Sequence, residues 1–168
     1  MSFKFIWNDG KRMCLQHLSP YTLTTVIDGI DCEIHIEFGH HCFTDQKENG
    51  DLFKPDRKED RFFSPERYRD SFRLPELVTT LFQEKEGHVT AYYNAGNQEC
   101  YYHVDYLDYS VYMTIQKPPQ THDQLKVRII SAYEQDEWGR SPGGKKVMMY
   151  FLLSERLKGN SILKRKRR

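Results

Sequence analysis

Residues 22–38 read TLTTVIDGIDCEIHIEF, and this stretch decides the fold class. Asp28-Gly29 separates two alternating runs, Thr22–Ile27 and Ile30–Phe38. Asp-Gly is a strong hairpin signal because a type I′ turn needs positive φ at both central residues. The second run places apolar residues on one face and polar residues on the other: Ile30, Cys32, Ile34, Ile36 and Phe38 against Asp31, Glu33, His35 and Glu37. This period of two predicts a half-buried antiparallel strand.

Strand-like alternation recurs on both sides of this hairpin. Asn8-Asp9-Gly10 interrupts an earlier run in the same way, so the first 44 residues are predicted to be strands and turns. Later strands are predicted at His88–Asn94, Glu99–Tyr106, Tyr109–Gln116 and Leu125–Glu134, with Ala95–Gln98 as the connection between the first two. We expect one central antiparallel sheet that contains Ile30–Phe38, Tyr109–Gln116 and Leu125–Tyr133.

Helix signals occur at two places in the chain. Ser64-Pro65-Glu66 supplies a hydroxyl N-cap, a proline at the first helical position and an early acid. Pro75 would remove a hydrogen bond within that helix, which predicts a kink or two consecutive helices ending before Gly87. Residues 145–158 predict a helix stopped by Gly159, although residues 147–153 also fit a buried strand.

Three segments are expected to stay outside the core. Asp45–Arg61 carries eleven charged residues in seventeen and reads as a solvated loop. Trp138–Gly144 is a glycine-rich loop, and Lys164–Arg168 is a basic tail that we expect to be disordered. The sequence therefore predicts a single α+β domain over residues 1–163, with a mostly antiparallel sheet packed by one or two helices.

Composition limits the class of protein. The 168 residues suit one domain, and 23 aromatic residues (10 Phe, 11 Tyr and 2 Trp) supply much of the apolar area. The 25 basic residues nearly balance the 24 acidic ones, so an anion site must be local. No apolar run approaches the roughly 20 residues of a membrane span, and residues 1–5 carry no apolar export signal. We expect a soluble, cytoplasmic protein without a membrane partner.

Gly39-His40-His41 is the first candidate catalytic segment. Gly39 ends the alternation and predicts a β-bulge, which often re-aims side chains beside a site. An imidazole titrates near neutral pH and can take the proton of a ribose 2′-hydroxyl. We assign the general base to His41, or to His40 if a bulge turns the chain by one residue. The competing interpretation is that both histidines cap a strand end and hydrogen-bond locally.

The strand Leu125–Glu134 is the second candidate segment. Strict alternation places Leu125, Val127, Ile129, Ser131 and Tyr133 on one face, and Lys126, Arg128, Ile130, Ala132 and Glu134 on the other. Arg128 with Lys126 can hold a phosphate. Ser131 or Tyr133 can donate a hydrogen bond to a non-bridging oxygen. The competing interpretation is an ordinary strand whose basic residues face solvent.

Arginines near aromatic residues form a third candidate group, for RNA binding. Arg67, Arg69 and Arg73 lie beside the aromatic face of the first predicted helix, and guanidinium planes stack well on unpaired bases. We assign flanking nucleotides to Arg69 and Arg73, with Lys126 at the phosphate. A solvated helix face gives the same pattern.

The cysteines and histidines do not form a recognisable metal motif. Cys14, Cys32, Cys42 and Cys100 are scattered and read as reduced thiols. Cys32, His35, His40, His41 and Cys42 lie within eleven residues and include zinc's preferred ligand types, so a metal site is a competing interpretation. Strand geometry argues against it, because Cys32 and His35 differ by an odd number of residues and point to opposite faces of one strand. The chain contains no Cys-x-x-Cys and no His-Glu-x-x-His pattern. We predict no structural metal ion, no cofactor and no disulfide.

The phrase LKVRIISA at residues 125–132 resembles the penultimate strand of some plasmid and prophage toxins. With its short antiparallel strands and its last hairpin bearing Arg128, Ser131, Tyr133 and Glu134, the chain is similar to small bacterial ribonuclease toxins of the barnase-like and mRNA-interferase group. The resemblance covers about ten residues and the general order of elements. The chain is longer than typical interferases and lacks their basic charge.

The resemblance implies a metal-independent endoribonuclease of a toxin–antitoxin or prophage system, with RNA as substrate and an antitoxin protein as partner. A second hypothesis is a non-catalytic interaction module, such as a phage or mobile-element adaptor that contacts host proteins. The two hypotheses differ in one spatial requirement. Catalysis requires His40 or His41 to share a cleft with Arg128 or Ser131.

Overall fold

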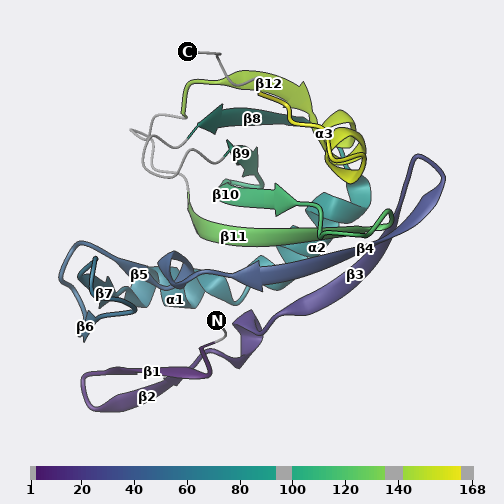
Figure 1. The fold of residues 1–168 in the computed structure, drawn as a ribbon. Coiled ribbons are helices and arrows are strands. Elements are labelled where there is room, and N and C mark those ends of the chain that lie inside the picture. The colour runs from purple at the N-terminus through teal and green to yellow at the C-terminus, as the bar shows by residue number, and fades with distance from the viewer. Residues whose placement is uncertain (1–2, 94–99, 135–141, 164–168) are drawn as a thin grey trace.

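Figure 1 shows the computed structural model, which describes residues 3–93, 100–134 and 142–163. The largest element is a seven-stranded sheet of order β12-β8-β9-β10-β11-β4-β3. In chain order its strands are β3 (Tyr21–Ile27), β4 (Ile30–Phe38), β8 (His88–Tyr93), β9 (Cys100–Tyr106), β10 (Tyr109–Gln116), β11 (Gln124–Glu134) and β12 (Lys145–Met148).

Two smaller sheets extend from the main sheet. One is the hairpin of β1 (Phe5–Asn8) and β2 (Lys11–Cys14), followed by the 3₁₀ turn η1 (Gln16–Leu18). The other contains β5 (Thr44–Asp45), β7 (Arg61–Phe63) and β6 (Leu52–Phe53), and it follows the 3₁₀ turn η2 (His40–Cys42). Asp9 and Gly10, like Asp28 and Gly29, have positive φ, as both predicted hairpin turns require.

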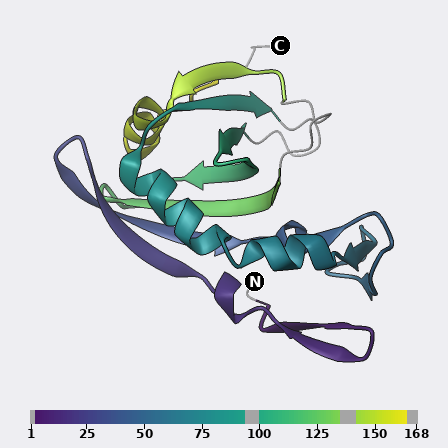
Figure 2. The same ribbon diagram turned by 180° about the vertical axis from the view of Figure 1, so that it is seen from behind.

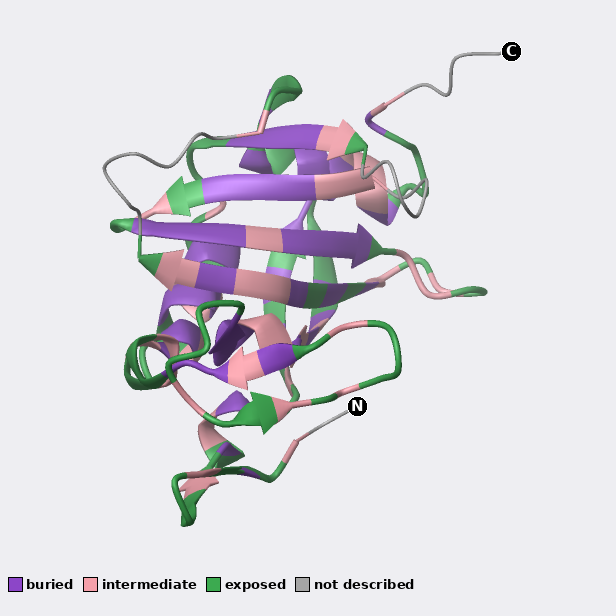
Figure 3. Cartoon of the chain, turned by 90° about the vertical axis from the view of Figure 1, so that its left-hand side faces the viewer, coloured by how far each residue is buried: buried purple, intermediate pink, exposed green. Residues whose placement is uncertain are grey.

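The predicted fold class is confirmed: the protein is α+β, and the three strands expected in one sheet all lie in it. Neighbouring strands of the main sheet are antiparallel except β4 and β11, which are parallel. Burial classes alternate along β3, β4 and the first half of β11, whereas β8, β9 and β10 each contain three consecutive buried residues (Figure 3). One face is apolar, and the opposite face carries polar side chains in β4, β10 and β11.

Helices α1 (Pro65–Ser71) and α2 (Leu74–Glu84) cover the apolar face (Figure 2). The Ser64 hydroxyl accepts a hydrogen bond from the Arg67 amide at 3.2 Å, as expected of an N-cap. Pro75 lies in the first turn of α2, so the prediction of two consecutive helices is confirmed. Buried α2 residues pack with the sheet to form the core: Leu74, Leu77, Val78, Leu81 and Phe82.

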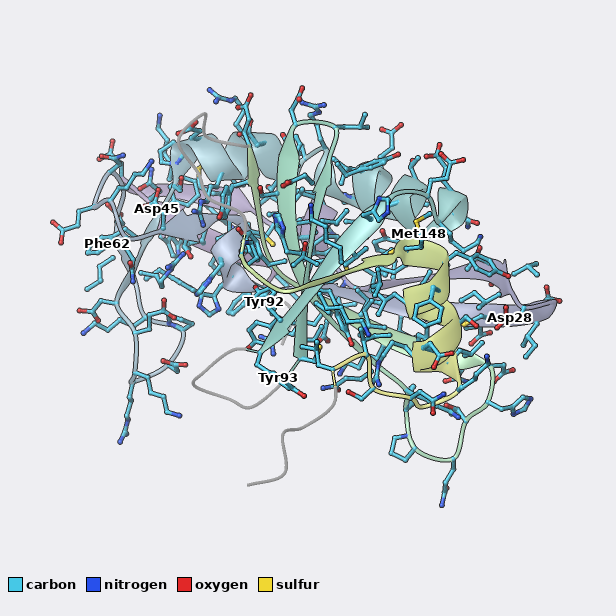
Figure 4. All side chains as sticks on the ribbon, turned by 90° about the horizontal axis from the view of Figure 1, so that it is seen from above. Asp28, Asp45, Phe62, Tyr92, Tyr93 and Met148 are labelled. Atoms are coloured by element: carbon cyan, nitrogen blue, oxygen red, sulfur yellow. The ribbon has the colours of Figure 1, made fainter. Side chains whose placement is uncertain are left out.

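Helix α3 (Met149–Leu157) begins four residues later than the sequence predicts, because residues 145–148 form β12 at the sheet edge. Gly144 lies against β8, where a Cβ atom would come within 2.2 Å of the Ala91 carbonyl oxygen. Pairing of residues 145–148 with β8 therefore overrides the helical periodicity of their sequence. Tyr150 of α3 accepts a hydrogen bond from the Asp28 amide at 3.1 Å, and Figure 4 shows Asp28 near α3, far from Asp45 and Phe62.

The prediction that Asp45–Arg61 is entirely solvated is wrong at both ends of that segment. Asp45 and Arg61 are buried in the small sheet, each with 6% of its surface exposed. The Arg61 guanidinium donates a hydrogen bond to the Thr44 carbonyl at 2.8 Å. This bond offsets part of the free-energy cost of burying the guanidinium. The predicted connection Ala95–Gln98, most of the Trp138–Gly144 loop and the Lys164–Arg168 tail lie outside the described residues. Among the described residues, no helix is long and apolar enough to cross a membrane.

Candidate active site

A cleft of about 480 Å³ opens on the polar face of the sheet, beside the end of β4. Its walls come from β4, η2, β9, β10 and β11. The residues that line it are Glu37, Gly39, His40, His41, Tyr101, Thr114, Gln116, Lys126, Arg128 and Ile130. Two histidines and two basic residues that the sequence predicts from separate segments therefore meet around one cavity.

The parallel pairing of β4 and β11 brings these segments together. It places Glu37 opposite Arg128, and His35 opposite Lys126. Because the two strands run in the same direction, the residues that follow β4 lie beside the later residues of β11. Lys126 Nζ lies 3.7 Å from Glu37 Oε1, so this lysine is paired within the cleft wall.

Gly39 allows the two chains to approach closely. Its amide donates to the Ile129 carbonyl at 2.7 Å, and a Cβ atom here would lie 3.0 Å from the Ile130 carbonyl oxygen. The expected bulge at Gly39 is not present: this residue has extended backbone (φ −82°, ψ 165°) and precedes η2. The 3₁₀ turn, rather than a bulge, points the histidines at the cleft.

A bulge occurs instead in β11, opposite Tyr112 and Met113. Tyr112 pairs with Ser131 and Met113 pairs with Ile129, so Ile130 is an extra residue. The bulge corrects the predicted faces of this strand, because Ala132 now enters the core while Ser131 and Tyr133 stay half-buried. Ser131 and Tyr133 thus come to the same face as Arg128, although neither lines the cleft.

Tyr133 belongs to an aromatic group next to the cleft. Its hydroxyl donates to the Tyr112 hydroxyl at 3.2 Å, and the two rings stack with centroids 5.8 Å apart. The Arg67 guanidinium lies 4.7 Å from the centroid of the Tyr133 ring. Burial raises the pKa of Tyr112, and its hydrogen bond with Tyr133 acts in the same direction.

Glu59 completes the group around the histidines, and sequence reasoning missed it. Its Oε2 atom lies 3.2 Å from His41 Nε2 and 3.7 Å from His40 Nε2, and its Oε1 atom lies 3.2 Å from an Arg61 nitrogen. Glu59 is one of many charged residues in its segment, and no local pattern distinguishes it from the others. Only the fold of the small sheet places it here.

Burial sets the protonation of this group. It lowers the pKa of His40 to about 4, with help from neighbouring His41, and it also lowers the pKa of His41. Burial opposes ionisation of Glu59, but the hydrogen bond with His41 and the charge of Arg61 hold the pKa of Glu59 below its usual value. Because an ionised carboxylate only accepts hydrogen bonds, His41 donates through Nε2–H and keeps Nδ1 as a proton acceptor.

Arg67 and Thr44 hold the backbone of the histidine turn. The Arg67 guanidinium donates to the carbonyls of His41 and Thr44, each at 2.9 Å. The Thr44 hydroxyl donates to the His40 carbonyl at 2.8 Å. These hydrogen bonds hold the backbone of η2 in place, so the imidazoles are positioned before any ligand binds.

The two arginines predicted to bind flanking nucleotides do not reach the cleft. Arg69 is exposed on α1 and lies 3.6 Å from neighbouring Asp70. Arg73 precedes α2, with its guanidinium 5.3 Å from the Tyr109 ring centroid. Of the predicted RNA-binding residues, Lys126 alone lines the cavity.

The cysteines take no part in the cleft walls, and all four carry free thiols. Cys32 is buried in the core, and burial raises the pKa of its thiol to about 11. His35 is on the opposite face of β4, as the sequence predicts, with Nδ1 2.9 Å from the Thr22 hydroxyl. This geometry does not favour the Cys32–His35 combination as a metal site.

Comparison with known proteins gives a match to a family model. The model of the YjaZ family matches residues 2–157, which is most of the chain. No curated protein and no solved structure matches.

Proposed function

The chain belongs to the YjaZ family, and we propose that it cleaves RNA by transesterification without a metal ion in the reaction. One observation carries this proposal: His40, His41, Lys126 and Arg128 line the same cleft. A general base and a cation beside one cavity are the groups that attack by a ribose 2′-hydroxyl requires.

In the proposed reaction, His41 Nδ1 takes the proton of the 2′-hydroxyl. The 2′-oxygen then attacks phosphorus, the bond to the 5′-oxygen breaks, and that oxygen takes up a proton from water as it leaves, while the imidazolium returns its proton to solvent. The products are a 2′,3′-cyclic phosphate and a 5′-hydroxyl. Glu59 accepts a hydrogen bond from His41 Nε2–H and stabilises the imidazolium that forms. His40 lies next to His41 and is the alternative base.

Arg128 and Lys126 would bind the phosphate. Both side chains are exposed at the cleft, and charge on the non-bridging oxygens increases as the 2′-oxygen attacks. The polar face continues past Ser131 to the stacked Tyr112–Tyr133 pair. We assign a neighbouring base to this aromatic pair, since rings of this kind stack on unpaired bases.

RNA digestion in excess EDTA tests the proposal. His41→Ala and Arg128→Ala should each slow cleavage by about 10²–10⁴-fold if the wild-type protein is active. His122→Ala and Arg12→Ala are matched controls, since both side chains are exposed and outside the cleft. Circular dichroism should show that all four variants fold. Full activity in both cleft variants would remove these residues from the mechanism.

The second candidate function, a non-catalytic interaction module, rests on the β1–β2 hairpin. Phe5 and Trp7 are 40% and 57% exposed on this hairpin, and the Arg12 guanidinium lies 4.4 Å from the Phe5 ring centroid. Aromatic residues and arginine are enriched where proteins dock. An inactive wild-type protein, on free RNA and on translating ribosomes, would favour this function. A host-protein partner would then be sought, with Trp7→Ala as the binding-deficient variant.

A further inference from the structure

We infer that His40, His41 and Glu59 form a binding site for a divalent transition-metal ion, with zinc as the best-suited ion. Imidazole nitrogens and a carboxylate oxygen are ligands that zinc accepts. This inference goes beyond the proposed RNA cleavage, which uses no metal ion. The zinc ligands considered from the sequence included Cys32 and Cys42. Here the third ligand is instead Glu59, from the charge-rich segment Asp45–Arg61.

The distances suit a metal ion. Glu59 Oε2 lies 3.2 Å from His41 Nε2 and 3.7 Å from His40 Nε2, and the three ligand atoms all lie within 4.8 Å of one another. Ligands bound at about 2.0–2.1 Å in tetrahedral geometry are about 3.3 Å apart. Small side-chain rotations would therefore bring all three atoms into coordination.

His40 Nε2 supplies an independent indication. This atom is inaccessible to solvent and has no hydrogen-bond partner among the described residues. The nearest Glu59 oxygen, at 3.7 Å, is too far for a hydrogen bond. A buried polar atom without a partner is costly, and a metal ion at this position would provide one. Metal binding needs uncharged imidazoles, the form that burial favours here.

The surroundings hold the ligands in place. The His40 and His41 rings meet edge to face with centroids 4.6 Å apart, and Phe3 contacts the His40 ring edge to face at 6.4 Å. Arg61 binds the Glu59 oxygen that faces away from the histidines, at 3.2 Å. Carboxylates that bind metal ions are commonly hydrogen-bonded in this way. The positive charge of Arg61 also lowers the affinity for a cation.

Three protein ligands leave one tetrahedral position open. Both histidines line the cleft, so the open position would be reached from that cavity and filled by water or an anionic ligand. Structural zinc sites are usually closed by four protein ligands. We therefore assign an exchangeable ion rather than a permanent structural one.

Isothermal titration calorimetry of the untagged, full-length chain with zinc chloride tests the site. We expect one ion per chain and a melting temperature that rises by roughly 5–10 °C when free zinc exceeds its dissociation constant a hundredfold. Glu59→Gln and His41→Gln should each weaken binding by at least about 100-fold, since loss of even an outer hydrogen-bond partner costs 10–100-fold. Both substitutions keep the side-chain length close to the original.

Matched controls separate this site from ordinary surface binding. His35→Gln and Glu33→Gln remove a histidine–glutamate pair whose Nε2 and Oε2 atoms lie 4.0 Å apart, and both variants should bind zinc as tightly as the wild type. Asp70→Asn disrupts the acidic group of Glu66, Asp70 and Glu134 and should also leave binding unchanged.

Two results would overturn the inference. One is the absence of both binding heat and thermal stabilisation in the wild type. The other is binding by folded Glu59→Gln and His41→Gln as tight as that of the wild type. Cobalt binding provides a second measurement in the wild type, because loss of its tetrahedral absorption on adding zinc reports the same site without a variant. No RNA is present in these experiments, so an inactive ribonuclease leaves their outcome unaffected.

Discussion

Gly39 is the residue that allows β4 and β11 to approach closely enough for the two histidines to line the cleft. Its backbone is extended, so the requirement for glycine here is space and not a left-handed conformation. The carbonyl oxygens of Ile129 and Ile130 lie 3.3 and 3.0 Å from where a Cβ atom would be. Both are backbone atoms and cannot rotate away, so any side chain would push the turn away from β11.

Gly39→Ala should therefore lower the free energy of unfolding by about 1–3 kcal/mol through this overpacking. Urea denaturation measures the effect. Gly143→Ala is the matched control, because nothing lies within 4 Å of its Cβ position and its φ is not positive. Equal stability of the two variants would show that β4 and β11 tolerate a wider separation.

His103 shows a second effect at the residue scale, the cost of a buried imidazole. Its side chain is 3% exposed, its Nε2 lies 3.0 Å from Asp105 Oδ1, and its ring lies 4.7 Å from the Tyr112 ring. Burial lowers the pKa of His103, although Asp105 acts in the opposite direction. The unfolded chain therefore binds a proton at this residue more readily than the folded protein does.

Stability should accordingly be highest above the ordinary histidine pKa of about 6.5 and should fall as the pH is lowered through and below that value. Urea unfolding between pH 7.5 and pH 5 measures this dependence. His103→Gln should flatten the curve, because it removes the group whose protonation favours unfolding. An NMR titration that places the pKa of folded His103 above 6.5 would contradict the prediction.

At the scale of elements, α1 supports the site through Arg67. The helix starts at an N-cap, Ser64, and three residues later presents Arg67 to the carbonyls of His41 and Thr44. The same guanidinium packs over Tyr133 of β11. One side chain thus joins the helix, the histidine turn and the bulged strand.

Arg67→Leu should destabilise the protein by about 1.5–3 kcal/mol, since it removes charged hydrogen bonds to half-buried carbonyl groups. Arg69→Leu on the same helix is the control and should change stability by less than about 0.5 kcal/mol, because Arg69 is 73% exposed. Chemical denaturation of both variants decides the point. Similar losses would mean that helix propensity, rather than the contacts of Arg67, controls stability here.

At the scale of the whole molecule, net charge is close to zero, at +1. The protein therefore has no strong overall field to attract RNA, and the proposed RNA binding would have to come from local cations. Lys126 and Arg128 supply them at the cleft, with Lys126 partly neutralised by Glu37.

Binding of a non-cleavable 2′-O-methyl RNA should depend on salt through these two residues. Each phosphate contact in single-stranded nucleic acid contributes about −0.7 to the slope of log K against log salt concentration. Lys126→Ala with Arg128→Ala should therefore reduce the slope by about 1.4 in fluorescence anisotropy measurements. Lys54→Ala with Lys158→Ala removes two exposed lysines outside the cleft and should leave the slope unchanged. An unchanged slope in the cleft variant would place RNA binding elsewhere.

Local signals in the sequence determined the hairpins, the strand faces of β4 and the start of α1. Asp28-Gly29, the alternation of residues 30–38 and Ser64-Pro65 each act over a few neighbouring residues, and the structure agrees with all three. Length and charge balance predicted one domain and a local anion site, and both stay predictions. Within residues 125–129 the predicted faces of β11 are also correct.

Tertiary structure alone decided how the site is assembled. The parallel pairing of β4 with β11, the extra residue Ile130 and the position of Glu59 all depend on contacts between segments far apart in the chain. Strand register follows from which faces can be buried together, and a one-residue bulge reverses every later side chain. Local alternation contains no such information, so it placed Ser131 on the wrong face and gave no reason to select Glu59 from a run of charges.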